Sequence, residues 1–325
     1  MFEFKVRLGG PAVPDRVVDI AIVGGGPAGY AAGIYAARAG RDVLLIEKGV
    51  PGGQMATTEL VENCPGCVEG SGAEIGTVMR RQALKFGLRE LTAEVTGMDL
   101  GAAPKRIETP AGDVLARVVI VATGAEPRRL GVPGESRLWG RGVSVCATCD
   151  APFFQDRDIV VVGGGSTALQ ESLYLTRFVR HLTIAHRRDQ FRGEAILRKR
   201  AEADPKIDFL LDTTVEEILG EGHVEGVRVR GHIDGREQVL PADGVFVFVG
   251  LEPNVDLVRD QLVLDANGQI AVDAQMRTSL SGVYAIGDVR GGAARQIVTA
   301  MSDGVVAALD AEHVLSLDGL VELHV

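Results

Sequence analysis

Two glycine-rich turns, each placed between an apolar run and a helix-forming stretch, constrain the fold of this chain most strongly. The first reads GGGPAG at 24–29 after the apolar run 17–23, and the second reads GGGSTA at 163–168 after 158–162. In such strand-to-helix turns the first glycine permits a tight turn, the third glycine (Gly26 or Gly165) lets a pyrophosphate approach the backbone, and the last small residue packs the helix on the strand. One such turn arises easily by chance. The pair predicts two dinucleotide-binding units.

The residues that follow the first turn predict which part of a nucleotide it meets. We expect a helix over 28–38 and a second strand over 43–46, and Glu47 stands at the end of that strand. An acidic residue at this point accepts hydrogen bonds from ribose hydroxyls. The first turn is therefore expected to bind a dinucleotide whose ribose carries free hydroxyls.

The second turn is followed by cations instead of an acid. After an expected helix over 167–177 and a strand over 182–185, the chain reads HRRDQFR at 186–192. Guanidinium groups pair bidentately with phosphate, so this cluster favours a ribose 2′-phosphate and therefore NADPH over NADH. The alternative is a solvated basic face or a patch that binds a partner.

All four cysteines occur in CxxC pairs, Cys64 with Cys67 and Cys146 with Cys149. In a chain of this size without a secretory signal, such pairs indicate redox or metal chemistry rather than a framework of structural disulfides. Four thiols also match the ligand count of a structural zinc site. The gap between the two pairs is far longer than in a zinc ribbon, and we expect no metal.

Composition is that of a soluble enzyme. The chain has 325 residues, 46% of them hydrophobic, and 42 glycines, which suits tight turns around a large core. Its net charge of −10 argues against nucleic acid as a partner. No apolar run approaches the roughly 18 to 20 residues that span a bilayer, and residues 1–16 lack the apolar core of a signal peptide. We therefore expect a cytoplasmic protein without membrane segments.

The order of elements predicts a nested layout. A strand over 118–121 ends in Ala-Thr-Gly, and a strand over 245–249 also ends in glycine. Beyond it, a strand over 282–286 closes on Gly287-Asp288 ahead of an expected helix over 296–309, an arrangement that suits the polyol and pyrophosphate of a flavin dinucleotide. The prediction is an α/β protein with two Rossmann-like three-layer domains, in which 127–252 is inserted between 1–126 and 253–325.

Taken together, these motifs resemble those of the low-molecular-weight, bacterial-type thioredoxin reductases, a class of pyridine nucleotide-disulfide oxidoreductases. The resemblance covers nearly everything from about residue 17 onward, and its matching stretches are 24–30, 52–54, 61–63, 122–124, 146–150, 163–168, 186–192, 287–289 and 295–296. It implies an FAD domain built from both ends of the chain, an inserted NADPH domain that carries the CATC dithiol, a homodimer, and electron transfer from NADPH through FAD and a Cys146–Cys149 redox disulfide to oxidised thioredoxin.

The resemblance also carries site residues over to matching positions of this sequence. The implied FAD site comprises Gly24, Gly26, Ala28, Gly29, Glu47, Gly53, Gln54, Asn63, Val95 (through its backbone), Asp288, Arg295 and Gln296. The implied NADPH site comprises Gly165, Ser166, Thr167, Glu171, His186, Arg187, Arg188 and Arg192. Ser166 replaces the asparagine expected there. Residues 1–16 and 290–294 have no clear counterpart.

By the same resemblance Cys149 is the sulfur on the flavin side, Cys146 attacks the partner disulfide, and Asp150 handles the proton. A simpler reading makes Asp150 the N-cap of the turn that follows. Cys64 falls in a loop beside the flavin where an aromatic or other apolar residue is common, so we favour packing for it. An auxiliary redox or zinc role for Cys64 and Cys67 stays open.

Several other functions remain to be weighed against a disulfide reductase. A dithiol oxidase acting on a small molecule would consume oxygen rather than NADPH, and the arginine cluster argues against it. A ferredoxin reductase has no use for the CATC segment. A non-enzymatic nicotinamide-sensing regulator needs neither CATC nor a flavin, and a zinc-stabilised binding module would hold zinc and no flavin.

Overall fold

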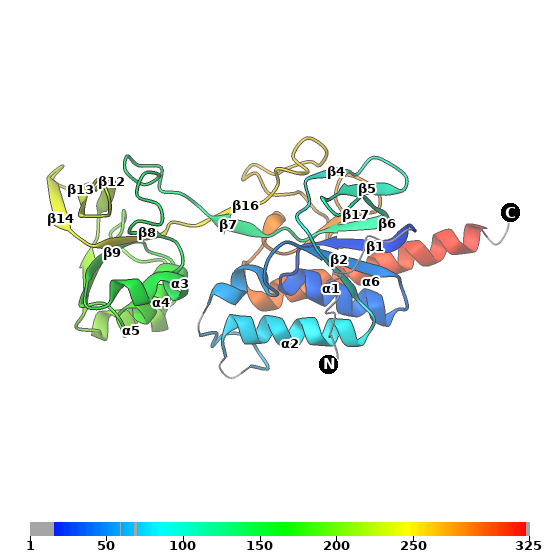
Figure 1. Ribbon diagram of the computed structural model, residues 1–325, viewed down its shortest axis with the longest axis horizontal. Coiled ribbons are helices and arrows are strands. Elements are labelled where there is room, and N and C mark those ends of the chain that lie inside the picture. The colour runs from blue at the N-terminus through cyan, green and yellow to red at the C-terminus, as the bar shows by residue number, and fades with distance from the viewer. Residues whose placement is uncertain (1–15, 59, 68–69, 323–325) are drawn as a thin grey trace, which may run out of the picture. The chain divides into compact units, whose positions relative to one another are not determined.

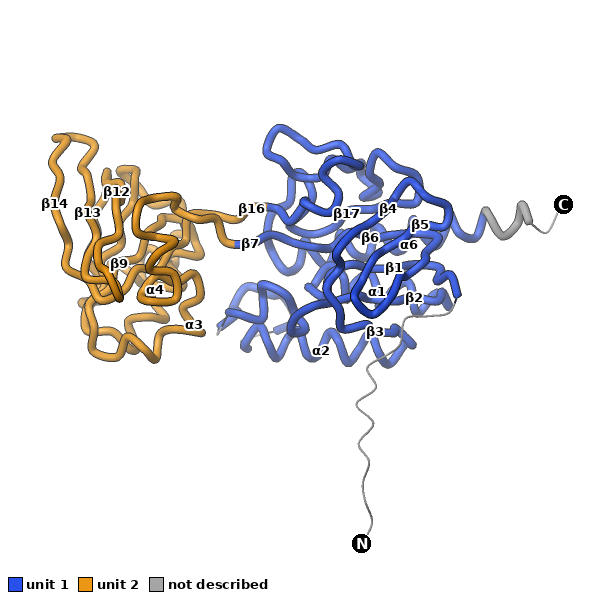
Figure 2. The backbone as a smooth tube through the Cα atoms, turned by 45° about the horizontal axis from the view of Figure 1, so that its top comes forward, with its two compact units in different colours: residues 1–126, 253–325 blue, residues 127–252 orange. Residues whose placement is uncertain are grey.

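The computed structural model describes residues 16–58, 60–67 and 70–322, with side chains described as far as residue 317. The segment 1–15, which carries most of the expectation about a signal peptide, therefore lies outside the described residues. The backbone divides into two compact units: unit 1 combines 1–126 with 253–325, and unit 2 is 127–252 (Figure 2). Each unit contains its own sheet and its own hydrophobic clusters.

The sheet of unit 1 has the strand order β3-β2-β1-β6-β5-β4, with β17 also paired to β6. Five of its strands are parallel: β1 (Val18–Val23), β2 (Val43–Glu47), β3 (Arg89–Thr92), β6 (Val114–Val121) and β17 (Val283–Ala285). The other two, β4 (Gly97–Asp99) and β5 (Lys105–Glu108), extend the sheet in antiparallel fashion. The central strands are buried on both faces, which is why they read as continuous apolar runs.

Three helices cover one face of this sheet (Figure 1): α1 (Pro27–Arg38), α2 (Gly72–Lys85) and α6 (Ile297–Glu322). Helix α2 starts at a capping box in which Ser71 and Glu74 satisfy each other's backbone N–H groups. Two 3₁₀ turns, η1 (Gly53–Thr57) and η3 (Gly287–Val289), precede the helices that they adjoin. Residues between Val255 and Ile270 pack on the opposite face of the sheet.

Helix α6 extends well past the predicted end at residue 309. It continues to Glu322, because Gly304 is followed by neither glycine nor proline until residue 319 and Ala307, Ala311 and Leu315 are buried in the same cluster as α1. The prediction of its end was therefore wrong: the apolar face that holds the helix is longer than the local pattern indicated.

Unit 2 repeats the three-layer plan with a smaller parallel sheet, ordered β11-β10-β9-β15-β8. Its strands are β8 (Val143–Ser144), β9 (Asp158–Gly163), β10 (His181–Ala185), β11 (Ile207–Leu210) and β15 (Gly244–Phe248). One face packs on the helical segments α3 (Ala147–Asp150), η2 (Ala151–Phe154), α4 (Ser166–Leu175) and α5 (Ala195–Ala203). The other packs on an antiparallel layer formed by β12 (Thr213–Leu219), β13 (Gly226–Gly231) and β14 (Glu237–Pro241).

Two short strands connect the units. β7 (Ala125–Pro127) and β16 (Leu251–Pro253) pair with each other. Both units have the strand-turn-helix order that the glycine turns predicted, so the α/β fold with two Rossmann-like units is confirmed.

Candidate functional site

The first glycine turn, between β1 and α1, is closed by packing at two positions and open at a third. Gly24 has φ +116°, and a Cβ there would lie 2.1 Å from the carbonyl oxygen of Ala122. A Cβ on Gly29 would lie 2.0 Å from the carbonyl oxygen of Gly24, whereas a Cβ on Gly26 would have no atom within 4 Å. The turn therefore leaves free space beside Gly26 at the start of a 12-residue helix, which fits a pyrophosphate.

Glu47, at the end of β2, lies on this turn. Its two carboxylate oxygens accept hydrogen bonds from the N–H groups of Gly25 and Gly49, each at 2.6 Å. The N–H of Gly52 donates to the carbonyl oxygen of Gly25 at 2.9 Å, which docks η1 against the turn. The structure thus brings Glu47 and the η1 residues Gly53 and Gln54 to one edge of unit 1.

A buried ion pair holds η3, which carries Asp288. Asp303 on α6 accepts from the N–H of Gly287 at 3.1 Å and from two guanidinium nitrogens of Arg290 at 2.9 and 2.7 Å. The amide of Gln269 donates to the backbone carbonyls of Asp288 and Arg290. Burial raises the pKa of the Asp288 carboxyl. The η3 turn is therefore fixed from two sides.

Sequence reasoning missed Arg290, Asp303 and Gln269. A usable signal existed for Asp303, since it is a charged residue inside the apolar stretch of α6, a position that calls for a buried partner. Nothing in the spacing identified that partner as Arg290, in the segment that lacked a counterpart.

The remaining residues of the implied FAD site lie on unit 1 at several points. The Asn63 amide donates to the Gln296 side-chain oxygen at 3.3 Å, across a large separation in sequence. Ala28 packs near Gly287, where a Cβ would come within 3.1 Å of the Ala28 methyl group. Arg295 is exposed with φ +56°. Val95 follows β3 and packs against the hydrophobic cluster that includes Val255 and Ile270, on the face of the unit 1 sheet opposite α1.

The second glycine turn, between β9 and α4, repeats the geometry of the first. Gly163 has φ +152° and a Cβ there would lie 2.4 Å from the carbonyl oxygen of Phe248, whereas Gly165 has open space around it. The Ser166 hydroxyl accepts from the N–H of Glu194 at 3.1 Å. The replacement of the expected asparagine thus retains a hydrogen-bonding side chain at the start of α4.

The cation segment folds back onto this second turn. The N–H of Arg192 donates to the carbonyl oxygen of Gly164 at 2.8 Å. Arg187, Arg188 and Arg192 are exposed, and within the described part of the chain none of them forms an ion pair. Their guanidinium groups are therefore available to an anion.

His186 differs from the arginines beside it. It is 5% exposed, its ring stacks on Phe191 with centroids 5.5 Å apart, and a Cβ on Gly164 would lie 2.3 Å from that ring. Burial, followed by the nearby arginines, lowers the pKa of His186. His186 is therefore buried beneath the turn, its Nε2 atom has no hydrogen-bond partner among the described residues, and its implied contact with NADPH stays a prediction.

Two further residues of the implied NADPH site lie on α4. Thr167 is exposed in the first turn of this helix. Glu171 is partly buried one turn further on, and burial raises its pKa to about 7. Thr167 therefore lies beside Gly165 at the start of α4. Burial makes ionisation of the Glu171 carboxyl unfavourable in free energy.

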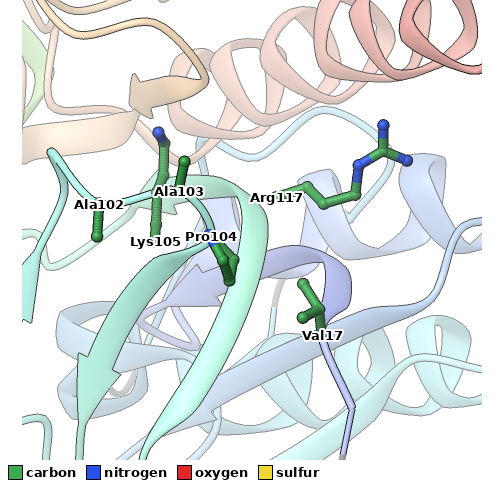
Figure 3. Close-up of a pocket in the computed structure, with 6 residues that line it drawn as sticks. All are labelled: Val17, Ala102, Ala103, Pro104, Lys105 and Arg117. Atoms are coloured by element: carbon green, nitrogen blue, oxygen red, sulfur yellow. The ribbon is translucent and has the colours of Figure 1, made fainter. Parts of the chain in front are cut away.

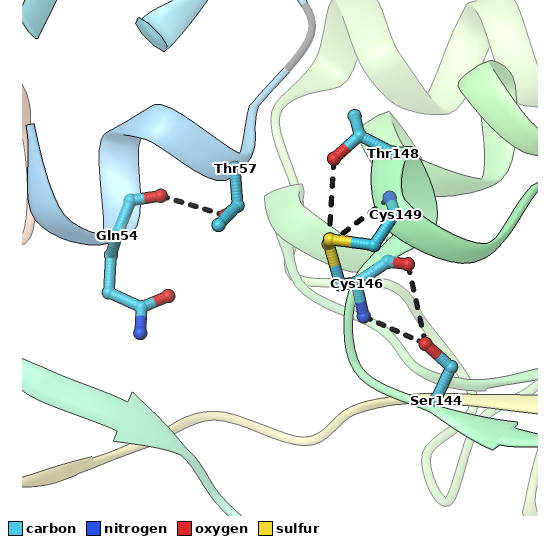
Figure 4. Close-up of a disulfide and its surroundings, with 6 residues drawn as sticks. All are labelled: Gln54, Thr57, Ser144, Cys146, Thr148 and Cys149. Carbon is cyan, nitrogen blue, oxygen red and sulfur yellow. Dashed lines mark hydrogen bonds between the residues drawn. A yellow bond between two sulfur atoms is a disulfide. The ribbon is translucent and has the colours of Figure 1, made fainter. Parts of the chain in front are cut away.

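Cys146 and Cys149 form a disulfide at the start of α3 (Figure 4), with Cα atoms 5.4 Å apart. The N–H of Cys149 donates to the Cys146 sulfur at 3.2 Å, and the Ser144 hydroxyl accepts from the N–H of Cys146 at 3.0 Å. Asp150 ends α3 and is the N-cap residue of η2, but its side chain makes no capping hydrogen bond there. Ser144 was not anticipated from the sequence.

Cys64 and Cys67 are outside any disulfide of the described chain, and the first is buried and the second partly exposed. Among the residues that the structure describes, no group of three or more His, Cys, Asp or Glu side chains is arranged to hold a metal ion. The burial of Cys64 agrees with the packing interpretation.

A separate pocket of about 450 Å³ opens at the other end of the unit 1 sheet from the first glycine turn (Figure 3). It is lined by Val17, Ala102, Ala103, Pro104, Lys105 and Arg117. Burial lowers the pKa of Lys105. None of the predicted nucleotide or dithiol residues lines this pocket.

In the described chain, no helix is both long and apolar enough to cross a membrane.

Known proteins resemble this chain over nearly its whole length. A family model described as pyridine nucleotide-disulphide oxidoreductase matches residues 18–304. A thioredoxin reductase of Mycolicibacterium smegmatis is 46% identical over 302 residues, which cover 92% of this chain and 97% of that protein. One from Listeria monocytogenes is 44% identical over 302 residues, which cover 93% and 95%.

Solved structures give the same result. The crystal structure of Lactococcus lactis thioredoxin reductase matches with a TM-score of 0.88 and 40% identity, covering 90% of this chain and 97% of that one. The thioredoxin reductase of T. acidophilum also matches with a TM-score of 0.88, at 34% identity, covering 92% and 99%.

Proposed function

Because this chain belongs to the pyridine nucleotide-disulphide oxidoreductase family, we propose that it is an NADPH-dependent flavoprotein that reduces the disulfide of a thioredoxin. The observation that carries the proposal is the Cys146–Cys149 disulfide, which lies in the same unit as the second glycine turn. A disulfide closed over two intervening residues, beside a nucleotide turn, is suited to reversible exchange rather than to bracing a fold.

We assign FAD to the first turn and NADPH to the second. The space beside Gly26 and Gly165 fits a pyrophosphate, and Glu47 stands where ribose hydroxyls need an acceptor. Arg187 and Arg188 are exposed and form no ion pair with any described residue, as a cation that binds a 2′-phosphate requires. When bound, NADPH supplies a hydride and FAD relays the electron pair to a disulfide.

Cys146 is the sulfur that we assign to attack on thioredoxin. Cys149 is the more exposed residue, which taken alone favours Cys149. The thiolate is the nucleophile, however, and only the Cys146 sulfur accepts a backbone N–H, which stabilises its charge once the disulfide opens. Asp150, directly after Cys149, is assigned to the proton transfers that accompany opening and closing.

The test is NADPH oxidation by the purified holoenzyme, followed by nicotinamide absorbance under anaerobic conditions with and without oxidised thioredoxin. We expect sustained oxidation of NADPH only when thioredoxin is added, and its loss in Cys146→Ser and Cys149→Ser. Oxygen consumption with a small dithiol and no use of NADPH would instead establish a dithiol oxidase. Purification without a flavin would contradict both enzymes and favour a nicotinamide-sensing binding protein.

The family resemblance also supports two proposals about the working enzyme, namely a homodimer and a cytoplasmic location. Light scattering on the purified holoenzyme checks the first, where a mass near the single-chain value of 34.4 kDa contradicts it. Fractionation of cells that express the native chain checks the second.

A further inference from the structure

The loop between η1 and α2 presents two cysteines at a tight turn in unit 1. Its base is closed by hydrogen bonds from Val61 N–H to the Gly70 carbonyl and from Gly72 N–H to the Thr58 carbonyl, both 2.8 Å. Such a closed base limits how far the loop can move, because the ends of the loop are held together. Cys64 and Cys67 lie between these two points.

The sequence Cys-Pro-Gly-Cys at 64–67 forms this turn through its backbone. The N–H of Cys67 donates to the Cys64 carbonyl at 3.0 Å, and Gly66 has φ +94°. Proline at the second position and a glycine with positive φ at the third are the pattern of a type II β-turn. The outer Cα atoms of a β-turn lie within about 7 Å of each other, which overlaps the separation of roughly 4.4 to 6.8 Å that a disulfide needs.

Packing accounts only partly for these two residues. Cys64 is 7% exposed, yet it belongs to none of the four hydrophobic clusters of the described chain. Cys67 is partly exposed, and after burial it is the second cause that raises the pKa of the Cys64 thiol. A volume-filling role for Cys64 gives no reason for a second thiol at the other end of the turn.

We propose that Cys64 and Cys67 form a second redox-active dithiol, which exchanges with low-molecular-weight disulfides and is separate from the Cys146–Cys149 pair. Cys67, the more accessible sulfur, attacks one sulfur of the external disulfide and releases the first thiolate. Cys64 then attacks the Cys67 sulfur and releases the second. One disulfide is reduced to two thiols, the cysteine pair is oxidised to a disulfide, and the two cysteine protons end on the released thiolates.

The experiment uses the full-length, flavin-loaded Cys146→Ser/Cys149→Ser variant, in which Cys64 and Cys67 are the two remaining cysteines of the chain. The protein is equilibrated with glutathione buffers of rising disulfide content, quenched with acid, alkylated and analysed by peptide mass. We expect an internal disulfide between Cys64 and Cys67. Its fraction should fall as the ratio of the squared glutathione concentration to the glutathione disulfide concentration rises. Two free thiols, or only glutathione adducts, in excess glutathione disulfide would overturn the proposal.

Single variants in the same background test the order of attack. With Cys64→Ser, Cys67 should accumulate as a stable glutathione mixed disulfide. With Cys67→Ser, Cys64 should react about tenfold more slowly, since burial raises its thiol pKa and restricts access. Faster reaction at Cys64 than at Cys67 would reverse the assignment.

Turn geometry supplies a matched control. A Cβ at Gly66 meets no atom within 4 Å, so Gly66→Ala strains the backbone without a clash. The dithiol can leave the turn to relieve this strain, whereas the disulfide requires the turn, so this change should shift the equilibrium towards the dithiol by about tenfold. Gly87→Ala, at φ +96° and equally open, should leave it unchanged. A shift in Gly87→Ala and none in Gly66→Ala would overturn the turn-based argument. No readout requires NADPH or thioredoxin, so the result is independent of the proposed function.

Discussion

At the scale of single residues, burial separates neighbours that look alike in sequence. His186 is packed under the second glycine turn, whereas Arg187 and Arg188, next in the chain, are exposed and without ion pairs in the described residues. A cation in solvent is free to pair with a phosphate, while a buried neutral imidazole contributes shape. The specificity that we propose for NADPH therefore belongs to the arginines.

We expect NADPH to be preferred over NADH by about a hundredfold or more in kcat/KM, since each charge-assisted bond to a 2′-phosphate contributes roughly 1.5 to 3 kcal/mol. Arg187→Gln with Arg188→Gln should erode this preference mainly through KM for NADPH. Arg177→Gln, an exposed cation on the same unit that lies over Tyr174, is the matched control. Steady-state kinetics with both nucleotides check the expectation, and equal efficiency in the unmodified enzyme contradicts it.

The two sulfurs of the disulfide are also inequivalent. Because Cys149 N–H supports a thiolate on Cys146, Cys149→Ser should trap a stable mixed disulfide with a thioredoxin whose second cysteine is removed and whose remaining cysteine is activated as a thionitrobenzoate mixed disulfide, from which Cys146 displaces thionitrobenzoate. Cys146→Ser should trap far less. Non-reducing electrophoresis after mixing measures the adduct, and preferential trapping by Cys146→Ser would exchange the two roles.

Glu171 makes the stability of unit 2 depend on pH. In the folded protein its pKa is about 7, above the ordinary value of 4.5, because burial disfavours the ionised carboxylate. The unfolding free energy is therefore highest below about pH 4.5, where the carboxyl is protonated in both states, and it falls as pH rises towards 7. The full effect is about 3 kcal/mol. Glu171→Gln should therefore raise the unfolding free energy relative to the native residue at pH 8 and hardly at pH 5. Denaturant unfolding without nucleotide measures it, and an equal effect at both pH values rules out this cause.

At the scale of elements, the approach of α6 to α1 depends on one glycine. A Cβ on Gly304 would lie 2.2 Å from the Ala28 carbonyl oxygen and 2.8 Å from the Ala32 nitrogen. Both atoms are backbone, so the helices must separate. Because Asp303 adjoins Gly304, such a movement also disturbs the ion pair that holds η3.

We expect Gly304→Ala to lower stability by at least about 1 to 3 kcal/mol, despite the gain of about 1 kcal/mol that alanine brings to a helix interior. Gly33→Ala in α1 is the control, because its Cβ would meet only the side chain of Leu88, at 3.1 Å, which can adjust. Thermal unfolding followed by flavin release compares them. Similar stability of the two variants contradicts the packing argument.

At the scale of the whole molecule, the chemistry is divided between units joined by β7 and β16. The Thr123 hydroxyl and the Asn254 amide each donate to the other's backbone carbonyl at the unit 1 end of this connection, and Arg128 N–H donates to the Gly250 carbonyl at the other end. In the function that we propose, hydride delivery and dithiol reduction both use the flavin. We therefore expect the units to change their relative position during turnover.

Gly124, directly before β7, tests this expectation. It has φ +69° and open space for a Cβ, so Gly124→Ala adds backbone strain at the connection without a clash. We expect kcat to fall roughly three- to tenfold, with the Kd for NADPH unchanged. Gly235→Ala is the control, because Gly235 has φ +65° in the loop between β13 and β14, so alanine there adds similar backbone strain away from the connection. Unchanged kcat in Gly124→Ala would contradict a role for this connection in turnover.

The sequence by itself determined the two strand-turn-helix units, the CATC segment and the arginine cluster, because each is encoded by adjacent residues whose turn chemistry needs no distant partner. Only the tertiary structure decided that Asp303 pairs with Arg290, that Asn63 meets Gln296, and that α6 continues past residue 309. Such contacts arise where packing brings separate segments together. Their energy depends on burial and on partners distant in the chain, and neither is written in local spacing or periodicity.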